Sequence, residues 1–130
     1  MDPDFNDIAD RFAKAFEEGD IAVIDSLYAP DAIVWHNTDE REQSRAENIA
    51  FAKAVPDLFE SFSYHDVRRS VFADGYVQQH VVHVVQNDGV MVKIPVCAIV
   101  RIANGQITRI DEYYDSKLEP DVVSKVLKQA

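Results

Sequence analysis

The chain has 130 residues and a mass of 14.7 kDa, and 47% of its residues are hydrophobic. This length fits one domain spanning residues 1–130, and the apolar fraction is that of a packed core rather than of a disordered segment. Lys and Arg number 13 against 23 Asp and Glu, which gives a formal net charge of −10. Because nucleic-acid affinity depends mainly on cation–phosphate pairing, and anionic bilayers repel acidic chains, we expect neither a nucleic-acid nor a membrane partner.

Cys97 is the single cysteine, so no intramolecular disulfide can form, and no cluster of Cys and His indicates zinc. His80 and His83 are three residues apart on a predicted strand, so their side chains point to opposite faces. We therefore expect neither a metal site nor a cofactor. The acidic N-terminus is unlike a signal peptide, and the most apolar stretch, Val90 to Val100, is too short to span a bilayer. These features predict a cytoplasmic protein.

The first half of the sequence predicts helices. Apolar residues spaced three and four apart indicate an amphipathic helix from Phe5 to Gly19. Asp20 can cap a short second helix that ends before Pro30, and a brief strand over residues 32–37 follows. The capping-box pattern Ser44-Arg45-Ala46-Glu47, in which serine and glutamate satisfy each other's backbone amides, then begins a third helix.

The second half predicts an antiparallel meander. Asp74-Gly75, Asp88-Gly89 and Asn104-Gly105 are hairpin signals between segments rich in Val, Ile, Tyr and Phe. A final short helix is expected from about Pro120 to Lys128. Helices followed by a meandering sheet make an α+β domain. The predicted strands cover approximately residues 63–73, 76–86, 90–102 and 106–115.

Both faces of this predicted sheet are apolar. An antiparallel sheet with one wet face alternates apolar and polar residues, whereas residues 81–85 are all valine except His83, and residues 96–100 are apolar without a break. The helices can cover one face. We expect the other face, which includes Cys97, to bind a second copy of the chain; the alternative is that the C-terminal helix covers it.

The turn at Asp88-Gly89 determines which side chains of the first central hairpin share a face. We expect a two-residue turn, so that the strands pair directly around it. One step of register moves every side chain to the opposite face. The expected pairs are His83 with Ile94, Val81 with Val96, and Gln79 with Ala98.

The turn at Asn104-Gly105 leaves two registers open. A two-residue turn sets Glu112 opposite Cys97, on the face of His80. A three-residue loop with Gly105 as a bulge residue sets Glu112 opposite Val96, on the face of His83.

Three segments carry a resemblance to a known superfamily. They are Asp31-Ala32-Ile33-Val34-Trp35-His36-Asn37, Phe72-Ala73-Asp74-Gly75, and Asn104-Gly105-Gln106-Ile107-Thr108-Arg109-Ile110-Asp111-Glu112-Tyr113-Tyr114-Asp115. In this order they resemble the nuclear transport factor 2-like superfamily, and within it SnoaL-like polyketide cyclases, ketosteroid-isomerase-like proteins and limonene epoxide hydrolases. The resemblance implies a cone-shaped, strongly curved sheet around helices, a deep apolar pocket, and a homodimer through the outer sheet face.

The resemblance to epoxide hydrolases favours the bulged register and implies roles for three residues. Glu112 stands where that family has a catalytic aspartate, and Trp35 and Asn37 stand where it has a tyrosine and an asparagine that position water. Gln79 and Val81 replace the arginine and second aspartate of its relay, so we do not expect epoxide hydrolysis by that route. The Tyr and Asp arrangement of ketosteroid isomerases is also not found at matching positions.

These registers predict a mostly apolar pocket for a small hydrophobic molecule. Glu112 would exchange protons with help from His83, while Asn37 and Trp35 hydrogen-bond a carbonyl or enolate oxygen. The function would be that of a cofactor-independent isomerase, cyclase, dehydratase or hydrolase. A non-catalytic binding protein, a protein-interaction domain, and a solvated rim position for Glu112 remain alternatives. The predicted pocket residues are Trp35, Asn37, Gln79, Val81, His83, Ile94, Val96, Ala98, Ile110, Glu112 and Tyr114, with Phe12, Phe16 and Phe51 from the helices.

Overall fold

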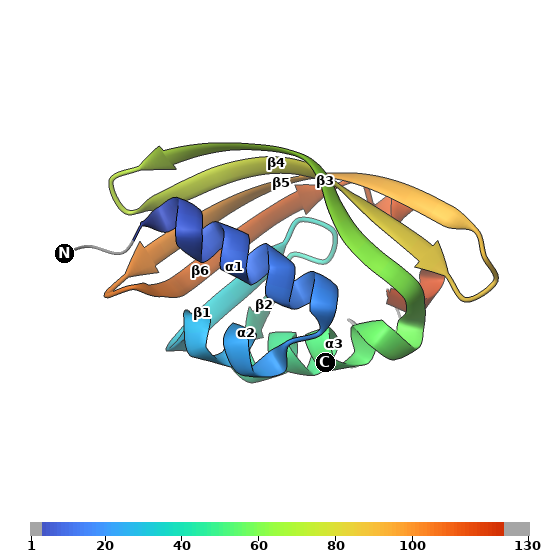
Figure 1. Ribbon diagram of the computed structural model, residues 1–130, viewed down its shortest axis with the longest axis horizontal. Helices are drawn as coiled ribbons and strands as arrows, with labels where there is room; N and C mark the ends of the chain where they lie inside the picture. The colour runs from blue at the N-terminus through green and yellow to red at the C-terminus, as the bar shows by residue number, and fades with distance from the viewer. Residues whose placement is uncertain (1–3, 124–130) are drawn as a thin grey trace.

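The computed structural model describes residues 4–123. Within them helices come first and long strands follow, the order that the sequence predicts for an α+β domain. Figure 1 shows the main helices on the concave side of a strongly curved sheet. The helices are α1 (Phe5–Glu18), α2 (Ile21–Leu27), α3 (Arg45–Leu58) and the 3-10 helix η1 (Ser116–Leu118). The strands are β1 (Tyr28–His36), β2 (Glu42–Ser44), β3 (Phe59–Phe72), β4 (Gly75–Gln86), β5 (Met91–Ala103) and β6 (Gln106–Tyr114).

Capping residues place the helix ends where the sequence predicts them. Gly19 follows α1 with φ of 68°, a left-handed conformation that glycine adopts without strain. The Asp20 side chain accepts the Val23 N–H at the start of α2. Ser44 and Glu47 satisfy each other's backbone amides at the start of α3, which confirms the predicted capping box.

The sheet has the strand order β2-β1-β6-β5-β4-β3. Strands β3 to β6 form the predicted antiparallel meander, but β1 pairs with β6 in parallel. The three-residue strand β2 is not among the elements that the sequence predicts. The architecture is nevertheless the expected α+β cone, in which a curved sheet, antiparallel in most of its pairings, wraps around the N-terminal helices (Figure 1).

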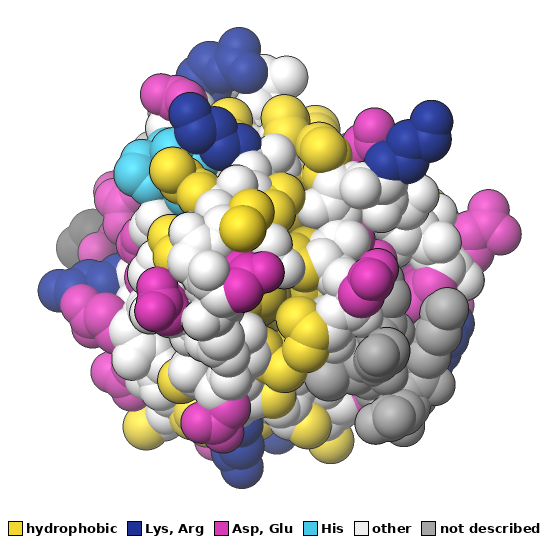
Figure 2. All heavy atoms as spheres, turned by 90° about the vertical axis from the view of Figure 1, so that its right-hand side faces the viewer, with side chains coloured by type: hydrophobic (Ala, Val, Ile, Leu, Met, Phe, Trp, Pro, Cys, Tyr) yellow, Lys and Arg dark blue, Asp and Glu magenta, His cyan; other side chains and the backbone are white. Residues whose placement is uncertain are grey.

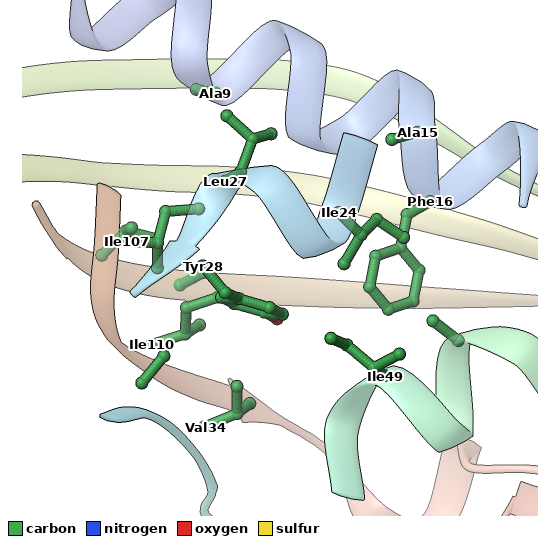
Figure 3. Packing of buried hydrophobic residues seen from close by; sticks show 14 of the residues in the cluster. Ala9, Ala15, Phe16, Ile24, Leu27, Tyr28, Val34, Ile49, Ile107 and Ile110 are labelled. Carbon is green, nitrogen blue, oxygen red and sulfur yellow. The ribbon is translucent and has the colours of Figure 1, made fainter. Parts of the chain in front are cut away.

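The core lies between the concave face of the sheet and the helices. Figure 3 shows Phe16 of α1, Ile24 of α2 and Ile49 of α3 pointing toward one another. Ile24 and Ile107 are fully buried, and each buried side chain of this size contributes about 1.5–3 kcal/mol of transfer free energy. This packing fixes the helices against one face of the sheet, and so it limits the size of a molecule that can fit between them.

The loop between β4 and β5 corrects the expected register. Gln86 N–H donates to Val90 O, so three residues rather than two form the loop, and Gly89 has φ of 87°. A three-residue loop with a left-handed glycine is the next most common hairpin connection. Val82 therefore lies opposite Ile94, and His83 lies opposite Lys93. Every side chain of β4 is on the opposite face from the one predicted.

The loop between β5 and β6 is a two-residue turn in which Asn104 and Gly105 both have positive φ. A bulge follows on β6, because Arg101 pairs with Arg109 whereas Ile102 pairs with Ile107. Glu112 consequently lies opposite Ala98 rather than opposite Cys97 or Val96. It shares its face with His80, so the favoured alternative that groups it with His83 is wrong.

Two further expectations concern helices. The helix predicted from about Pro120 to Lys128 lies mostly outside the described residues. Of this predicted helix, the structure describes Asp121–Val123 as helical. Among residues 4–123, no helix is both long and apolar enough to span a bilayer.

Candidate functional site

A cavity of about 120 Å³ lies between the helices and the concave face of the sheet. Its walls are mostly aromatic and aliphatic, with α1, α3 and strands β1, β3, β4, β5 and β6 all contributing. For comparison, an apolar cavity of about 150 Å³ holds a benzene molecule. In Figure 2, which views the molecule from the right-hand side of Figure 1, hydrophobic side chains form a band across the middle of the face, flanked by acidic side chains. The cavity is of a size for one small ring or a branched molecule.

Part of the predicted set lines this cavity. Glu112 and Ile110 reach it from β6, and Tyr114 reaches it from the end of the same strand. The inward-facing residues of β5 follow from its alternating burial pattern. The other predicted residues that the structure places in the lining are Ile94, Val96, Ala98, Phe12, Phe16 and Phe51.

The predicted residues of β4 lie outside the cavity. Gln79, Val81 and His83 all occupy the convex face, because the three-residue loop shifts the register by one position. His83 stacks on His65 of β3 with 3.7 Å between ring centroids. This placement corrects the expectation that His83 faces a ligand beside Glu112.

Trp35 and Asn37 also lie away from the cavity. Trp35 packs edge-on against Tyr113 on the convex face, with 5.3 Å between ring centroids. The Asn37 side chain accepts the Tyr114 N–H at 2.9 Å and donates to Tyr114 O at 3.2 Å, so it ties β1 to the end of β6. His36, between them in sequence, points into the cavity instead.

His36 and Glu112 are neighbours across the parallel pair of β1 and β6. Their Nε2 and Oε2 atoms are 4.0 Å apart. The ring of His36 is buried, and its Nδ1 atom has no hydrogen-bond partner among the described residues. The carboxylate of Glu112 keeps 30% of its side-chain surface exposed, so it can reach a molecule that occupies the cavity.

A second polar group lies on β4. Arg69 Nε donates to Gln78 Oε1 at 2.9 Å, and Gln78 Nε2 lies 2.9 Å from His80 Nδ1. Gln78 and His80 both line the cavity, and the His80 ring packs on Tyr64. Burial lowers the pKa of His80 below its ordinary value of 6.5; the charge of Glu112 partly opposes this shift and Arg69 adds to it. His80 is therefore neutral near pH 7.

Tyrosine hydroxyls add further hydrogen-bonding groups to the walls. Tyr28 donates to Asn48 Oδ1 at 2.6 Å, and Tyr114 donates to Glu119 Oε1 at 2.7 Å. Burial raises the pKa of Tyr28, and the negative charge of Glu112 raises it further. The pKa of Tyr64 is raised by the same two causes in the same order. Both phenols therefore stay protonated; the Tyr28 O–H is already donated to Asn48, so the Tyr64 hydroxyl is the one of the two that can donate to a ligand.

The charged side chains of the cavity lining are acidic. It includes the carboxylates of Glu112 and Glu119 and, among the described residues, no Lys or Arg. Within the same part of the chain, no group of three His, Cys, Asp or Glu side chains is arranged to hold a metal ion. The chemistry available from these residues is proton transfer and hydrogen bonding.

Several polar residues of the cavity are not among those that the sequence predicts. The Asn87-Asp88-Gly89 segment carried the relevant signal, because a three-residue loop ending in a left-handed glycine moves Gln78 and His80 inward. The signal for His36 was its position next to Trp35 on a strand. Successive side chains of a strand point to opposite faces, so only one of the two can face the cavity. The missed residues are Tyr28, His36, Asn48, Tyr64, Tyr76, Gln78, His80 and Glu119.

The sequence profile of the SnoaL-like domain matches residues 9–110. Because this match covers most of the sequence, the chain belongs to the SnoaL-like domain family. Among curated proteins, none matches the chain significantly.

Solved structures of the same fold are similar over nearly the whole chain. A candidate SnoaL-like polyketide cyclase from Shewanella denitrificans has a TM-score of 0.78 and 15% identity, covering 99% of this chain and 100% of its own. A candidate polyketide cyclase from Xanthomonas campestris has a TM-score of 0.75 and 22% identity, covering 93% and 95%. A ketosteroid-isomerase-like protein from Catenulispora acidiphila, in complex with trimethylamine, has a TM-score of 0.76 and 14% identity, covering 85% and 87%. At these identities the comparison establishes a shared fold.

Proposed function

We propose that the chain is a cofactor-independent acid–base enzyme, an isomerase, cyclase, dehydratase or hydrolase acting on a small hydrophobic carbonyl-bearing or cyclic molecule. The observation that carries this proposal is the carboxylate of Glu112 inside an aromatic cavity. A positioned carboxylate in such surroundings can accept a proton from a bound molecule and return it. The fold alone does not determine the reaction, because related folds carry many activities.

The proposed reaction begins with proton removal next to a carbonyl group. Glu112 takes the proton, the C–H electron pair forms a carbon–carbon double bond, and the carbonyl π electrons move to oxygen. In a β,γ-unsaturated ketone the oxyanion electrons then re-form the carbonyl, the new double bond stays between the α- and β-carbons, and the electrons of the original double bond take the proton from Glu112 at the γ-carbon, so the substrate is isomerised with no net change in protons. His36, 4.0 Å from Glu112, helps to hold the carboxylate in place.

Deuterium exchange tests this proposal without knowledge of the product. A panel of small cyclic ketones and enones is incubated with the protein in D₂O, and deuterium next to the carbonyl is measured by mass spectrometry. Loss of a general base costs about a hundredfold or more in rate, so we expect a loss of that size in Glu112→Gln. Asp111→Asn, at the neighbouring position on the convex face, is the control and should keep the rate within about twofold. An unchanged rate in Glu112→Gln would remove Glu112 from the mechanism.

A second candidate is binding of a small organic cation without chemistry. The aromatic lining, the Glu112 carboxylate and the lack of Lys and Arg in the described lining favour it, because aromatic rings attract ammonium groups. The trimethylamine bound by the Catenulispora acidiphila protein gives it further support. Under this alternative, trimethylammonium raises the melting temperature and tert-butanol, of similar shape but uncharged, does not. Equal effects of the two would contradict charge recognition.

We also propose that a second copy of the chain covers the convex sheet face. Val81, Cys97 and Ile99 lie there only partly buried, and Trp35 and Tyr113 form an aromatic pair beside them. An apolar face of this kind favours association. Native mass spectrometry should detect a dimer, whereas a stable monomer at micromolar concentration would contradict the proposal and favour a different protein partner.

A further inference from the structure

The atoms of Arg69 determine how the Gln78 amide is oriented. A guanidinium group carries only donors, so the atom of Gln78 that meets Arg69 Nε at 2.9 Å must be the carbonyl oxygen. The amide nitrogen of Gln78 is then the atom 2.9 Å from His80 Nδ1. The orientation of the amide follows from its partner and does not depend on distinguishing oxygen from nitrogen.

The amide in turn determines the protonation of His80. The NH₂ group of Gln78 can only donate, so Nδ1 of His80 must accept with its lone pair. A neutral imidazole carries one N–H, which is therefore on Nε2. A proton on Nδ1 would set two donors against each other, and the lowered pKa of His80 agrees with a neutral ring.

Arg69 is held in place by groups other than Gln78. It pairs with Asp10 of α1 at 3.0 Å, and its side chain is only 11% exposed. It also donates to Asn6 Oδ1 at 3.3 Å and lies over the Tyr76 ring at 5.7 Å. The guanidinium is thus anchored between α1 and the sheet, and it can impose an orientation on Gln78 instead of following it.

The remaining nitrogen of His80 is available to a ligand. His80 lines the cavity, and its Nε2 has no hydrogen-bond partner among the described residues. Gln78, Ala98 and Glu112 lie opposite one another in a row across β4, β5 and β6. Because alanine is small, its place in this row leaves space between the Gln78–His80 side and Glu112.

We propose that Arg69 and Gln78 are positioning residues that hold His80 as the neutral Nε2–H tautomer, which donates one hydrogen bond to an acceptor oxygen of the molecule in the cavity. The tautomer is a property of the free protein. The catalytic part rests on the proposed function: as Glu112 removes a proton, charge develops on the carbonyl oxygen of the substrate, and His80 stabilises it as a donor. His80 has no free lone pair with which to act as a base, so the two residues have separate roles.

Nitrogen-15 NMR of the free protein tests the tautomer directly. In the wild type we expect His80 to have a protonated Nε2 and an unprotonated Nδ1. Gln78→Glu keeps the shape but offers only acceptor oxygens, so the proton should move to Nδ1. Gln79→Glu, at the next position on the convex face, makes the same charge change and should leave His80 unaltered. A wild-type His80 with Nδ1–H, or no change in Gln78→Glu, would overturn the proposal.

Arg69→Met provides a second, independent variant. Without its donor the Gln78 amide is free to rotate, so we expect His80 to become a mixture of tautomers, while Arg68→Met on the convex face leaves it uniform. A uniform Nε2–H tautomer in Arg69→Met would overturn the role of Arg69.

The deuterium-exchange assay then separates this proposal from the proposed function. Loss of one preorganised donor costs about a hundredfold in rate, which we expect for Gln78→Glu and not for Gln79→Glu. An exchange rate unchanged in Gln78→Glu would overturn the donor role. If no variant or wild type exchanges deuterium while the NMR result holds, the proposed function fails and the positioning of His80 stands.

Discussion

The concave and convex faces of the sheet contain similar residues but place them in different surroundings. On β4, Gln78 and His80 face the cavity and are joined to Arg69 by hydrogen bonds, whereas Gln79 and His83 face outward. Both faces therefore present a glutamine and a histidine, and only the concave pair shares the cavity with Glu112. The comparison shows that register, not residue type, decides which side chains can act on a bound molecule.

The charged groups of the two faces also differ in what they stabilise. On the convex face Arg109 pairs with Glu42 and Asp111, and Arg101 pairs with Asp74. These pairs are partly or largely exposed, and such pairs contribute about 0–1 kcal/mol each. On the concave face the polar groups are buried, so an unpaired one costs more than an exposed pair contributes. Substitutions on the concave face should therefore reduce the free energy of unfolding more than substitutions on the convex face.

The largest expected difference concerns two isoleucines of β5. Ile102 is buried on the concave face, and Ile99 is partly exposed on the convex face. Ile102→Ala should reduce the free energy of unfolding by about 2–5 kcal/mol, and Ile99→Ala by about 1 kcal/mol or less, as measured by urea denaturation. A reduction in the free energy of unfolding of Ile99→Ala that grows with protein concentration would support a second copy of the chain on that face. Equal losses at every concentration would contradict the difference between the faces.

Two tyrosines give a smaller difference. Tyr28 is buried and donates to Asn48, whereas Tyr113 is exposed. Tyr28→Phe removes the donor and leaves a buried acceptor unpaired, which should cost about 1–3 kcal/mol. Tyr113→Phe should change the free energy of unfolding by about 0.5 kcal/mol or less in the same urea titration. A loss at Tyr113 as large as at Tyr28 would argue against the assigned faces.

The smallest expected effect is a pH dependence that comes from His80. Its pKa is lowered in the folded protein, so below its ordinary pKa of 6.5 the unfolded chain binds a proton that the folded chain does not. This contribution to stability is present above that pH and is lost as the pH falls. His80→Gln should therefore lose less stability than the wild type between about pH 7 and about pH 5, measured by urea midpoints. Identical pH profiles would contradict a buried neutral His80.

The helices and hairpins were predictable because their signals are local. The Ser44–Glu47 capping box, Gly19 after α1 and the Gly residues of the hairpins each depend on a few neighbouring residues. Strand β2 and the parallel pairing of β1 with β6 were not predictable in this way, since they depend on contacts between distant segments.

Which residues line the cavity depends on whether the register is shifted by an even or an odd number of positions. An even shift keeps each side chain on its face, and an odd shift moves it to the other face. The expected shift at Gly105 and the observed bulge on β6 displace Glu112 in opposite directions, to Val96 or to Ala98, which lie on one face. Glu112 therefore faces the cavity with either partner. A single extra loop residue at Asn87 has no such compensation, so His80 replaces His83.

The register of β4 and β5 is the central claim, and NMR can measure it without a ligand. Since Gln86 N–H donates to Val90 O, alternation makes His83 and Lys93 a non-hydrogen-bonded pair. The α-protons of such a pair are close, so a nuclear Overhauser effect between Lys93 Hα and His83 Hα is predicted. An effect from Lys93 Hα to Val84 Hα instead would mean a two-residue turn, with His83 inside and His80 outside, and would contradict the account.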